Sequence, residues 1–184
     1  MVKQKSLFKN SSMNAYGGEL RKKAKNRGAR PLVTKSGSIH LSLRSTKATG
    51  IHSFQHSSKH KKVEEFITSF SRKKGILILK FANVGNHIHL HIKIPNHTLY
   101  RAWIRGLSSG LAMISMGLNG LNTLRKLNCK FWDYRPFSRV IRSWKHFQNT
   151  KNYIEINILE GMGMPRAQAE ILIKGSRHFF RSTA

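Results

Sequence analysis

The stretch Gly75–Ile94, with the sequence GILILKFANVGNHIHLHIKI, decides the fold because it joins two strand patterns through a turn. Residues 75–81 form a short apolar run that is typical of a buried strand. Residues 83–85 (NVG) have the composition of a tight turn. Residues 86–94 then alternate strictly between polar and apolar side chains, which indicates a strand with one buried face. The stretch therefore predicts a β-hairpin.

Strand and helix patterns on both sides of the hairpin complete a mixed α+β order. They are a strand at Ser38–Arg44, a helix at Lys59–Phe70, a helix at Thr98–Met116, a short strand at Phe137–Ile141, and a helix that begins after an N-cap at Ser143 and runs to Glu160. The order β-α-β-β-α-β-α predicts a ferredoxin-like antiparallel sheet with two helices on one face. The last helix is then expected to cover the other, more polar face.

The charge balance indicates a polyanionic partner. The 184 residues include 34 Lys and Arg but only 7 Asp and Glu, which gives a formal net charge of +27. A folded domain with so much like charge gains from nucleic acid, whose phosphates release counterions when they are neutralised. An acidic membrane surface is the other partner that the charge allows. A small ribosomal-type RNA-binding protein has the same composition.

The chain is long enough for one domain with a basic segment at each end. We expect a basic arm at residues 1–36, one domain at 37–160, and a basic tail at 161–184 in which Arg166–Ile173 is a possible helical segment. The arm either follows the nucleic acid or is a disordered solubilising tail.

The sequence predicts a cytoplasmic protein. Residues 1–10 contain lysines but lack the apolar segment of a secretory signal. The most apolar stretch, Leu107–Leu118, is shorter than the roughly 20 residues that span a bilayer. Cys129 is the single cysteine, so no intrachain disulfide requires an oxidising compartment.

The second strand of the hairpin places three histidines on one face. Successive side chains of a strand point to opposite sides, so His87, His89 and His91 lie together and the intervening apolar residues face the core. Two imidazoles two residues apart on a strand can bind one metal ion from the same side. The alternative is a solvated polar strand face with no metal.

The last helix carries a second polar group of interest. Tyr153 and Asn157 are four residues apart and share a helix face, which Glu160 continues. The apolar stripe of Trp144, Phe147, Ile154 and Ile158 is expected to face elsewhere. A tyrosine near a metal ion can attack a phosphodiester, and the amide oxygen of Asn157 could be a third ligand. The alternative is an exposed tyrosine and asparagine with no chemical role.

Several segments together resemble REP-associated tyrosine transposases, which are relatives of the small single-tyrosine insertion-sequence transposases. The segment 81–90 (FANVGNHIHL) resembles the family's HUH motif of two histidines separated by a hydrophobic residue, and Tyr153–Asn157 (YIEIN) resembles its Tyr-Ile-x-x-Asn nucleophile motif. Further matches are 17–20 (GGEL), 30–32 (RPL), 40–45 (HLSLRS), 131–133 (FWD) and 137–141 (FSRVI). The order and spacing of these segments are more specific than either motif alone.

This resemblance implies a chemistry for the named residues. His87 and His89 would bind Mg²⁺ or Mn²⁺, and Asn157 would complete the protein ligands. Tyr153 would attack a phosphate of single-stranded DNA that carries hairpins, leaving a 5′-phosphotyrosine and a free 3′-OH. The chain departs from the family at Ile158, where many relatives have proline, and at His91, where relatives often have an apolar residue.

The resemblance leaves three points open. The active site could lie within a monomer or be completed across a homodimer. His91 or Glu160 could also take part in metal binding. The protein could still move its gene or serve its host.

DNA contacts are expected from basic and aromatic side chains. The candidates lie in the arm, in a basic aromatic loop and beside the last strand: Arg21, Lys22, Lys23, Lys25, Arg27, Arg30, Arg125, Lys126, Lys130, Trp132, Arg135, Arg139 and Arg142. Phe131, Trp132 and Tyr134 could stack on unpaired bases. The alternative for Phe131 and Trp132 is packing in the core at the edge of the sheet.

Two other functions compete with a tyrosine transposase. One is a non-catalytic nucleic-acid binder, either a domesticated transposase or an RNA-binding protein. The other is a nuclease in which the histidines hold a metal and a water molecule is the nucleophile.

Overall fold

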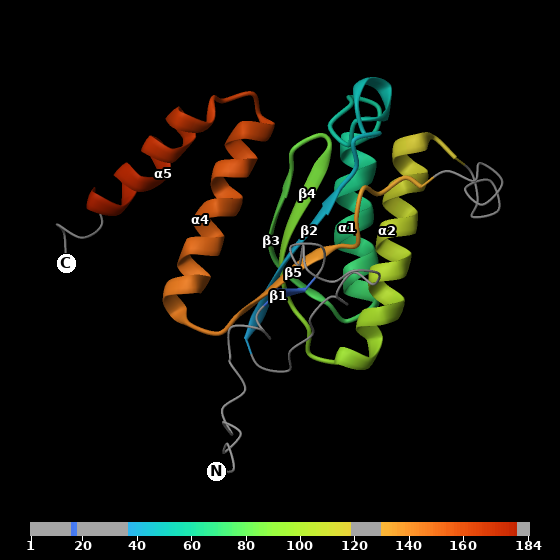
Figure 1. Ribbon diagram of the computed structural model, residues 1–184, viewed down its shortest axis with the longest axis horizontal. Coiled ribbons are helices and arrows are strands. Elements are labelled where there is room, and N and C mark those ends of the chain that lie inside the picture. Colours follow the sequence, from blue (N-terminus) through green and yellow to red (C-terminus); the bar gives the residue numbers. More distant parts are fainter. Residues whose placement is uncertain (1–15, 18–36, 119–129, 180–184) are drawn as a thin grey trace, which may run out of the picture.

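The computed structural model describes residues 16–17, 37–118 and 130–179, which form three layers (Figure 1). An antiparallel sheet lies in the middle. Helices α1 (His60–Lys73) and α2 (Tyr100–Met116) cover one face of it. Helix α4 (Trp144–Gly161) covers the other face, and α5 (Arg166–Phe179) packs on the outer side of α4. The expected α+β, ferredoxin-like arrangement is confirmed, including the placement of the Tyr153-bearing helix opposite the helix pair.

The sheet has the order β1-β5-β2-β4-β3, and each neighbouring pair is antiparallel. Its strands are β1 (Tyr16–Gly17), β2 (Ser38–Arg44), β3 (Leu77–Asn83), β4 (His87–Lys93) and β5 (Phe137–Ile141). The hairpin predicted from residues 75–94 is the β3–β4 pair. The central strands are β2 and β4, so the first strand of the domain lies directly beside the histidine strand. The two residues of β1 extend the sheet beyond β5.

The helix and strand boundaries match the sequence patterns to within about three residues, except in the tail. There α5 reaches Phe179, whereas the sequence indicated a possible helical segment only to Ile173. The helix begins directly after Pro165, whose carbonyl accepts from the amides of Gln168 and Ala169. Ala169 is fully buried, and tertiary packing of this kind stabilises a helix that its basic sequence alone signals only weakly.

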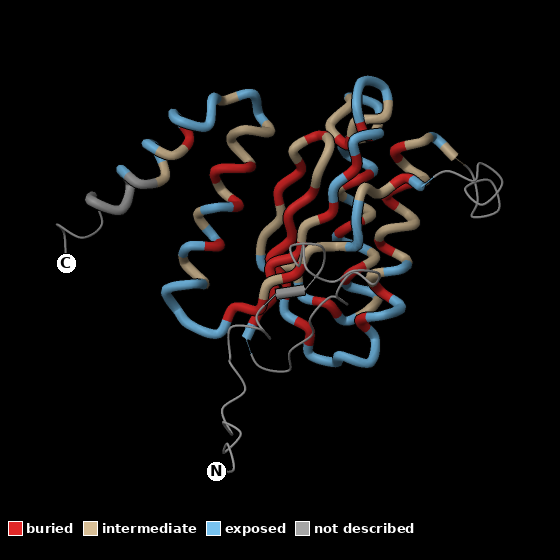
Figure 2. The backbone as a smooth tube through the Cα atoms, viewed as in Figure 1, coloured by how far each residue is buried: buried red, intermediate tan, exposed pale blue. Residues whose placement is uncertain are grey.

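The hydrophobic core lies between the sheet and the α1–α2 pair, where buried segments meet in Figure 2. Alternate residues of the two central strands enter it, as the hairpin pattern predicted: Ile39, Leu41, Leu43, Ile88, Leu90 and Ile92. Two glycines of α2 permit close packing of the helices. A Cβ at Gly110 would lie 2.1 Å from the Phe66 ring, and one at Gly106 would lie 2.4 Å from the Phe70 ring.

Among the described residues, no helix combines the length and the apolar character needed to cross a membrane.

Candidate active site

The sheet face under α4 is lined by polar side chains from three strands. Antiparallel register pairs Arg44 with His87, Ser42 with His89 and His40 with His91. Paired residues project to the same side of the sheet, so the polar faces of β2 and β4 form one surface. Because α4 packs on this surface, His89 and His91 are only 5% and 1% exposed. The alternative of a solvated polar strand face is therefore wrong for these two histidines.

His89 lies at the centre of the buried histidines. Its Nδ1 is 3.2 Å from Nε2 of His40, and the two rings stack with centroids 5.3 Å apart. Its other ring nitrogen, Nε2, is buried and has no hydrogen-bond partner within the described structure. A buried N–H without an acceptor is costly, whereas a lone pair there is available to a ligand. This favours the tautomer in which Nδ1 carries the proton and Nε2 carries the lone pair.

His87 is half-buried, with its ring edge-on to that of His89 at a centroid distance of 4.8 Å. Its Nδ1 lies 2.6 Å from the amide oxygen of Asn86. An amide oxygen can only accept, so this nitrogen of His87 donates and the lone pair of the neutral ring is on Nε2. The side chain of Asn157 lies close enough to His87 to raise the pKa of its ring. His87, His89 and Asn157 are thus brought together, as the sequence motifs predicted.

Tyr153 lies over the two stacked histidines. Its ring is edge-on to His89 at 5.2 Å and to His40 at 5.5 Å, measured between ring centroids. The side chain is 36% exposed, so one side contacts the histidines and the remainder is open to solvent. The structure therefore joins the tyrosine of the last helix to the histidine strand, which lies more than 60 residues earlier in the chain.

The sequence predicted that Asn157 lies on a face of the helix separate from the buried apolar stripe, and this prediction is wrong. Asn157 is 2% exposed and lies on the same buried side of α4 as Thr150 and Ile154. Its amide nitrogen donates to the carbonyl of Tyr153 at 2.6 Å, and its oxygen is left close enough to His87 to favour the protonated imidazole and so raise its pKa. The assignment of Trp144 to the buried stripe was wrong, because its side chain is 72% exposed.

A cap defines the start of α4, and two further contacts hold the helix over the sheet. At its start, the Ser143 side chain accepts from the amide of His146, which confirms the predicted N-cap. At its middle, Lys80 of β3 forms an ion pair with Glu155. At its end, the amide nitrogen of Gln55 donates to the carbonyls of Asn83 and Gly161, at 2.8 and 2.6 Å. These contacts hold Tyr153 and Asn157 in register with the histidines.

Arg166, the first residue of α5, adds a cation beside the tyrosine. Its guanidinium carbon lies 5.9 Å from the centre of the Tyr153 ring, within cation–π range. Glu160 accepts from it at 2.8 Å and Glu170 at 3.2 Å. Its charge also helps to lower the pKa of His89. Arg166 is therefore close enough to act on groups at the histidine–tyrosine cluster.

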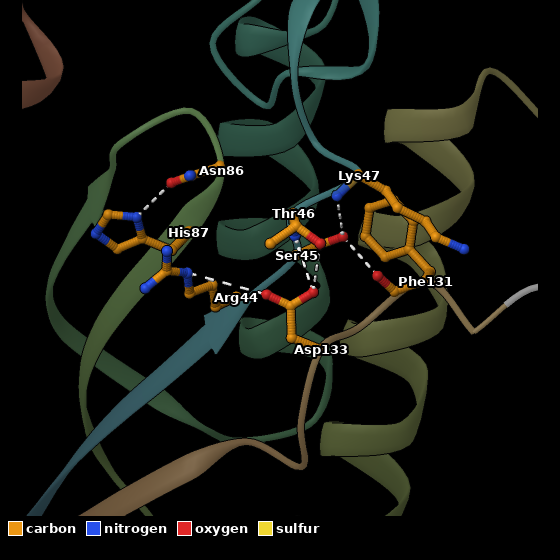
Figure 3. A network of polar contacts seen from close by, with 8 residues as sticks. All are labelled: Arg44, Ser45, Thr46, Lys47, Asn86, His87, Phe131 and Asp133. Carbon is orange, nitrogen blue, oxygen red and sulfur yellow. Dashed lines mark hydrogen bonds and ion pairs between the residues drawn. The ribbon is translucent and has the colours of Figure 1, made fainter.

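A second cation lies beside His87 (Figure 3). Arg44 is placed between the His87 ring and Asp133, with its Nε 3.9 Å from the carboxylate. Asp133 also accepts from the backbone and the hydroxyl of Thr46, both at 2.9 Å. The hydroxyl of Ser45 donates to the carbonyl of Phe131. This network ties the segment after residue 130 to the end of β2, beside the candidate site.

The buried histidines are held in the neutral state. Burial is the main cause that lowers the pKa of His40 to about 4 and that of His89 to about 2. Burial and then the charge of Arg44 lower the pKa of His87, although Asn157 and Glu160 act in the opposite direction. Neutral imidazoles keep a lone pair at pH 7, which is the form that binds metal ions.

The donor set fits a divalent cation with mixed nitrogen and oxygen ligands. Within the described part of the chain, no three His, Cys, Asp or Glu side chains converge on a common point. The amide oxygen of Asn157 is the further donor near His87, because the nitrogen of that amide is bonded to the Tyr153 carbonyl. The buried, unpartnered Nε2 of His89 is the atom that a metal ion would satisfy.

His91 has a different environment from the other two histidines of β4. Its Nε2 is 2.7 Å from the hydroxyl of Ser38, and its ring packs against Phe147 at 4.8 Å. Burial lowers its pKa to about 4. These contacts support a packing role rather than that of a competing ligand. Glu160 is near enough to His87 to raise its pKa, but it is paired with Arg166.

The candidate DNA-binding residues fall into three groups. Arg21, Lys22, Lys23, Lys25, Arg27, Arg30, Arg125 and Lys126 lie outside the described residues. The side chains of Lys130, Arg135 and Arg142 are exposed, while Arg139 is half-buried and faces the same side of the sheet as His40. Trp132 stacks on Phe54 at 5.8 Å and donates to the carbonyl of Ser108. Phe131 is buried in the core, so the packing alternative holds for both aromatic residues, whereas Tyr134 is 51% exposed.

Sequence reasoning missed His40 and Arg166. His40 is a polar residue of an alternating strand, and a ferredoxin-like order places that strand beside the histidine strand. The signal for His40 was therefore present. No sequence pattern indicated Arg166, because its position beside Tyr153 depends on the turn between α4 and α5.

Comparisons with known proteins support the fold. No model of a known protein family and no curated protein matches the chain. Among solved structures, a REP-associated tyrosine transposase bound to a REP hairpin is similar, with a TM-score of 0.54 and 16% identity over 73% of each chain. A candidate transposase from Deinococcus radiodurans R1 is 15% identical over 70% of this chain and 95% of that one, but its TM-score of 0.40 is too low to carry an argument. The chain thus shares the fold of an HUH-type tyrosine transposase.

Proposed function

We propose that this protein is a metal-dependent endonuclease and strand transferase for single-stranded DNA, with Tyr153 as its nucleophile. The observation that carries the proposal is the placement of Tyr153 over His89, whose buried Nε2 has no partner in the described structure. A nucleophile beside a set of unprotonated ligands is the arrangement that metal-assisted attack on a phosphodiester requires.

His87, His89 and the amide oxygen of Asn157 would hold the metal ion. Mg²⁺ or Mn²⁺, when bound, would polarise the scissile phosphate and offset its negative charge. His40 accepts from Nδ1 of His89 and so orients the ring, and Asn86 does the same for His87. The hydrogen bond from Asn157 to the Tyr153 carbonyl links ligand and nucleophile within one turn of α4.

The chemistry proposed for Tyr153 is a transesterification. Its phenolic oxygen forms a bond to phosphorus as the bond from phosphorus to the 3′ oxygen breaks. The phenol loses its proton and the leaving oxygen gains one, which gives a 5′-phosphotyrosine and a free 3′-OH. Because the phosphodiester energy is kept in the new ester, a 3′-OH can reverse the step and join strands.

Charge and structural likeness support the choice of substrate. The chain has a formal net charge of +27, and Arg44 lies near His87 and Arg166 near His89, where both can contact phosphates. The similar transposase was solved with a REP hairpin. We therefore propose single-stranded DNA with hairpin elements as the substrate.

A covalent-adduct assay tests the proposal. Single-stranded oligonucleotides with hairpins from around the gene are incubated with the protein and Mg²⁺, Mn²⁺ or EDTA, and then resolved on a denaturing gel. We expect a protein–DNA band that requires metal and is absent for Tyr153→Phe. Tyr134→Phe is the matched control, because Tyr134 is also an exposed tyrosine but is not part of the histidine cluster.

Each alternative function gives a different result. Cleavage that survives Tyr153→Phe and leaves no adduct would replace the proposal with a hydrolytic nuclease. Hairpin binding that weakens with salt, with no cleavage across a broad substrate library, would replace it with a non-catalytic binder.

A further inference from the structure

A cleft opens at the start of α4, beyond His91 on the same face of the sheet as the histidine–tyrosine cluster. It has a volume of about 370 Å³. Its lining comes from strands β2, β3, β4 and β5 and from the first turn of α4, and it includes Ser38, Leu79, Lys93, Arg142, Trp144 and Phe147. None of the contacts described for the candidate active site uses Trp144, Lys93 or Arg142.

Trp144 is the unusual residue of this cleft. Its side chain is 72% exposed, although an indole offers one of the largest apolar surfaces for burial. The ring lies parallel to Phe147, at 6° and a centroid distance of 5.4 Å. Phe147 in turn contacts His91, which Ser38 holds in place. Trp144 thus presents one exposed aromatic face, while its ring is stacked on Phe147.

Positive charge surrounds this aromatic surface. The exposed side chains of Lys93 and Arg142 line the cleft. The cleft also lies at the N-terminus of α4, where the helix dipole favours an anion. An exposed indole with cations beside it suits a ligand that has both a flat ring and a phosphate, which is the chemistry of an unpaired nucleotide.

The position of the cleft fits a strand that also reaches Tyr153. His89 and Lys93 are four residues apart on β4, so about 13 Å of strand separates the cleft from the candidate metal ligands at roughly 3.3 Å per residue. A few linked nucleotides can cross that distance. We propose that the cleft binds an unpaired nucleotide of the single-stranded DNA substrate, with its base stacked on Trp144 and its phosphate beside Lys93 and Arg142. This inference rests on the proposed function.

Contacts to the base and contacts to the phosphate can be measured separately, by comparing DNA with and without bases. A fluorescein-labelled oligothymidylate and an abasic phosphodiester chain of equal length are titrated with protein in a Tyr153→Phe background, so that cleavage plays no part. Binding is measured by fluorescence anisotropy. The variants are Trp144→Ala, Trp144→Phe and Lys93→Ala, with Ile51→Ala as the control, because Ile51 is an exposed apolar residue outside the cleft. Thermal unfolding checks that every variant is folded.

We expect Trp144→Ala to weaken oligothymidylate binding by roughly 5- to 150-fold, with the abasic chain nearly unaffected. Trp144→Phe should retain most of the affinity, and Ile51→Ala should retain all of it. Lys93→Ala should weaken both chains alike and reduce the salt dependence of binding by about one ion.

Equal losses on both chains, or no loss, for Trp144→Ala would overturn the inference. A change in the oligomeric state of Trp144→Ala without DNA, seen by sedimentation, would also overturn it, because the cleft would then be an interface between copies. The proposed catalytic function can be refuted independently of the nucleotide-binding cleft. If the Trp144 effect is found but no covalent adduct forms, the cleft binds a nucleotide and only the tyrosine chemistry is excluded. If the unsubstituted background protein binds neither chain, the inference about the cleft is wrong, whereas the proposed function is decided by the covalent-adduct assay with hairpin DNA.

Discussion

His40 Nε2 lies 3.2 Å from Nδ1 of His89, so a residue of the first long strand orients the central histidine of the candidate site. The two residues are 49 positions apart in the chain and meet because β2 and β4 are neighbours. The contact places the lone pair of His89 on the nitrogen that has no other partner. His40 is therefore a positioning residue in the proposed mechanism.

Substitution of His40 is expected to weaken metal binding. His40→Ala removes the acceptor for Nδ1 of His89, and loss of such an outer contact lowers metal affinity by about 10- to 100-fold. Mn²⁺ titration followed by electron paramagnetic resonance measures this directly, and ¹⁵N NMR reports the tautomer of His89. His97→Ala, at an exposed histidine in the connection after β4, should bind Mn²⁺ like the wild type. Unchanged Mn²⁺ affinity in His40→Ala would show that His89 does not need this contact.

Substitution of Arg166 is expected to slow cleavage more than it weakens DNA binding. The guanidinium is held beside Tyr153 by Glu160 and Glu170, where it can stabilise charge on the attacked phosphate. Because the side chain is exposed, we expect Arg166→Ala to lower the single-turnover rate by about 10- to 100-fold, less than a fully buried donor would. Arg166→Lys should restore part of the rate.

The control for Arg166 is Arg72→Ala, since Arg72 is an exposed arginine on α1, on the opposite side of the sheet. Parallel losses of rate and of binding in Arg166→Ala would reduce Arg166 to a general DNA contact.

Gly161 sets how closely the end of α4 approaches the sheet. A Cβ at this position would lie 2.5 Å from the carbonyl oxygen of Asn83 and 2.6 Å from Nε2 of Gln55. Gly161→Ala should therefore displace the helix and lower the free energy of unfolding by about 1–3 kcal/mol, as overpacking does. Gly175→Ala in α5 meets no atom within 4 Å and should be neutral or stabilising. Urea unfolding of both variants compares the two sites, and equal stability would show that α4 tolerates the shift.

The metal-free protein should lose stability as pH falls below about 6.5. Burial holds the pKa of His40 and His91 near 4, below the value of 6.5 in an unfolded chain. Between these values the unfolded chain binds more protons than the folded one, so acid favours unfolding. Each histidine contributes a slope of at most about 1.4 kcal/mol per pH unit between pH 6.5 and 4, and the loss ends below the folded-state pKa.

Urea unfolding in EDTA from pH 7.5 to 4 measures this slope, and His91→Gln should reduce it. His97→Gln is the matched control. A slope that is the same in wild type and His91→Gln would show that His91 does not titrate differently in the folded and unfolded chains.

Local patterns in the sequence determined the secondary structure and much of the topology. Strict alternation in residues 86–94 fixed which side chains of β4 face the core, because a strand turns alternate residues to opposite faces. Ser143 gave the start of α4, since its hydroxyl is the natural acceptor for a free amide of the first turn. The spacing of His87, His89, Tyr153 and Asn157 left their roles open, and the resemblance to tyrosine transposases named them as residues that the fold brings together.

Only the tertiary structure decided what surrounds those residues. Periodicity assigned Trp144 to the buried side of its helix and Asn157 to a separate face, yet Trp144 is exposed and Asn157 is buried. A repeat of 3.6 residues gives the angle between successive side chains around a helix. Which of these side chains become buried depends on how α4 packs against β3 and β4. His40 and Arg166 reach the site through a strand pairing and an interhelical turn. Such contacts join residues distant in the chain, so they depend on the packed fold rather than on any local pattern.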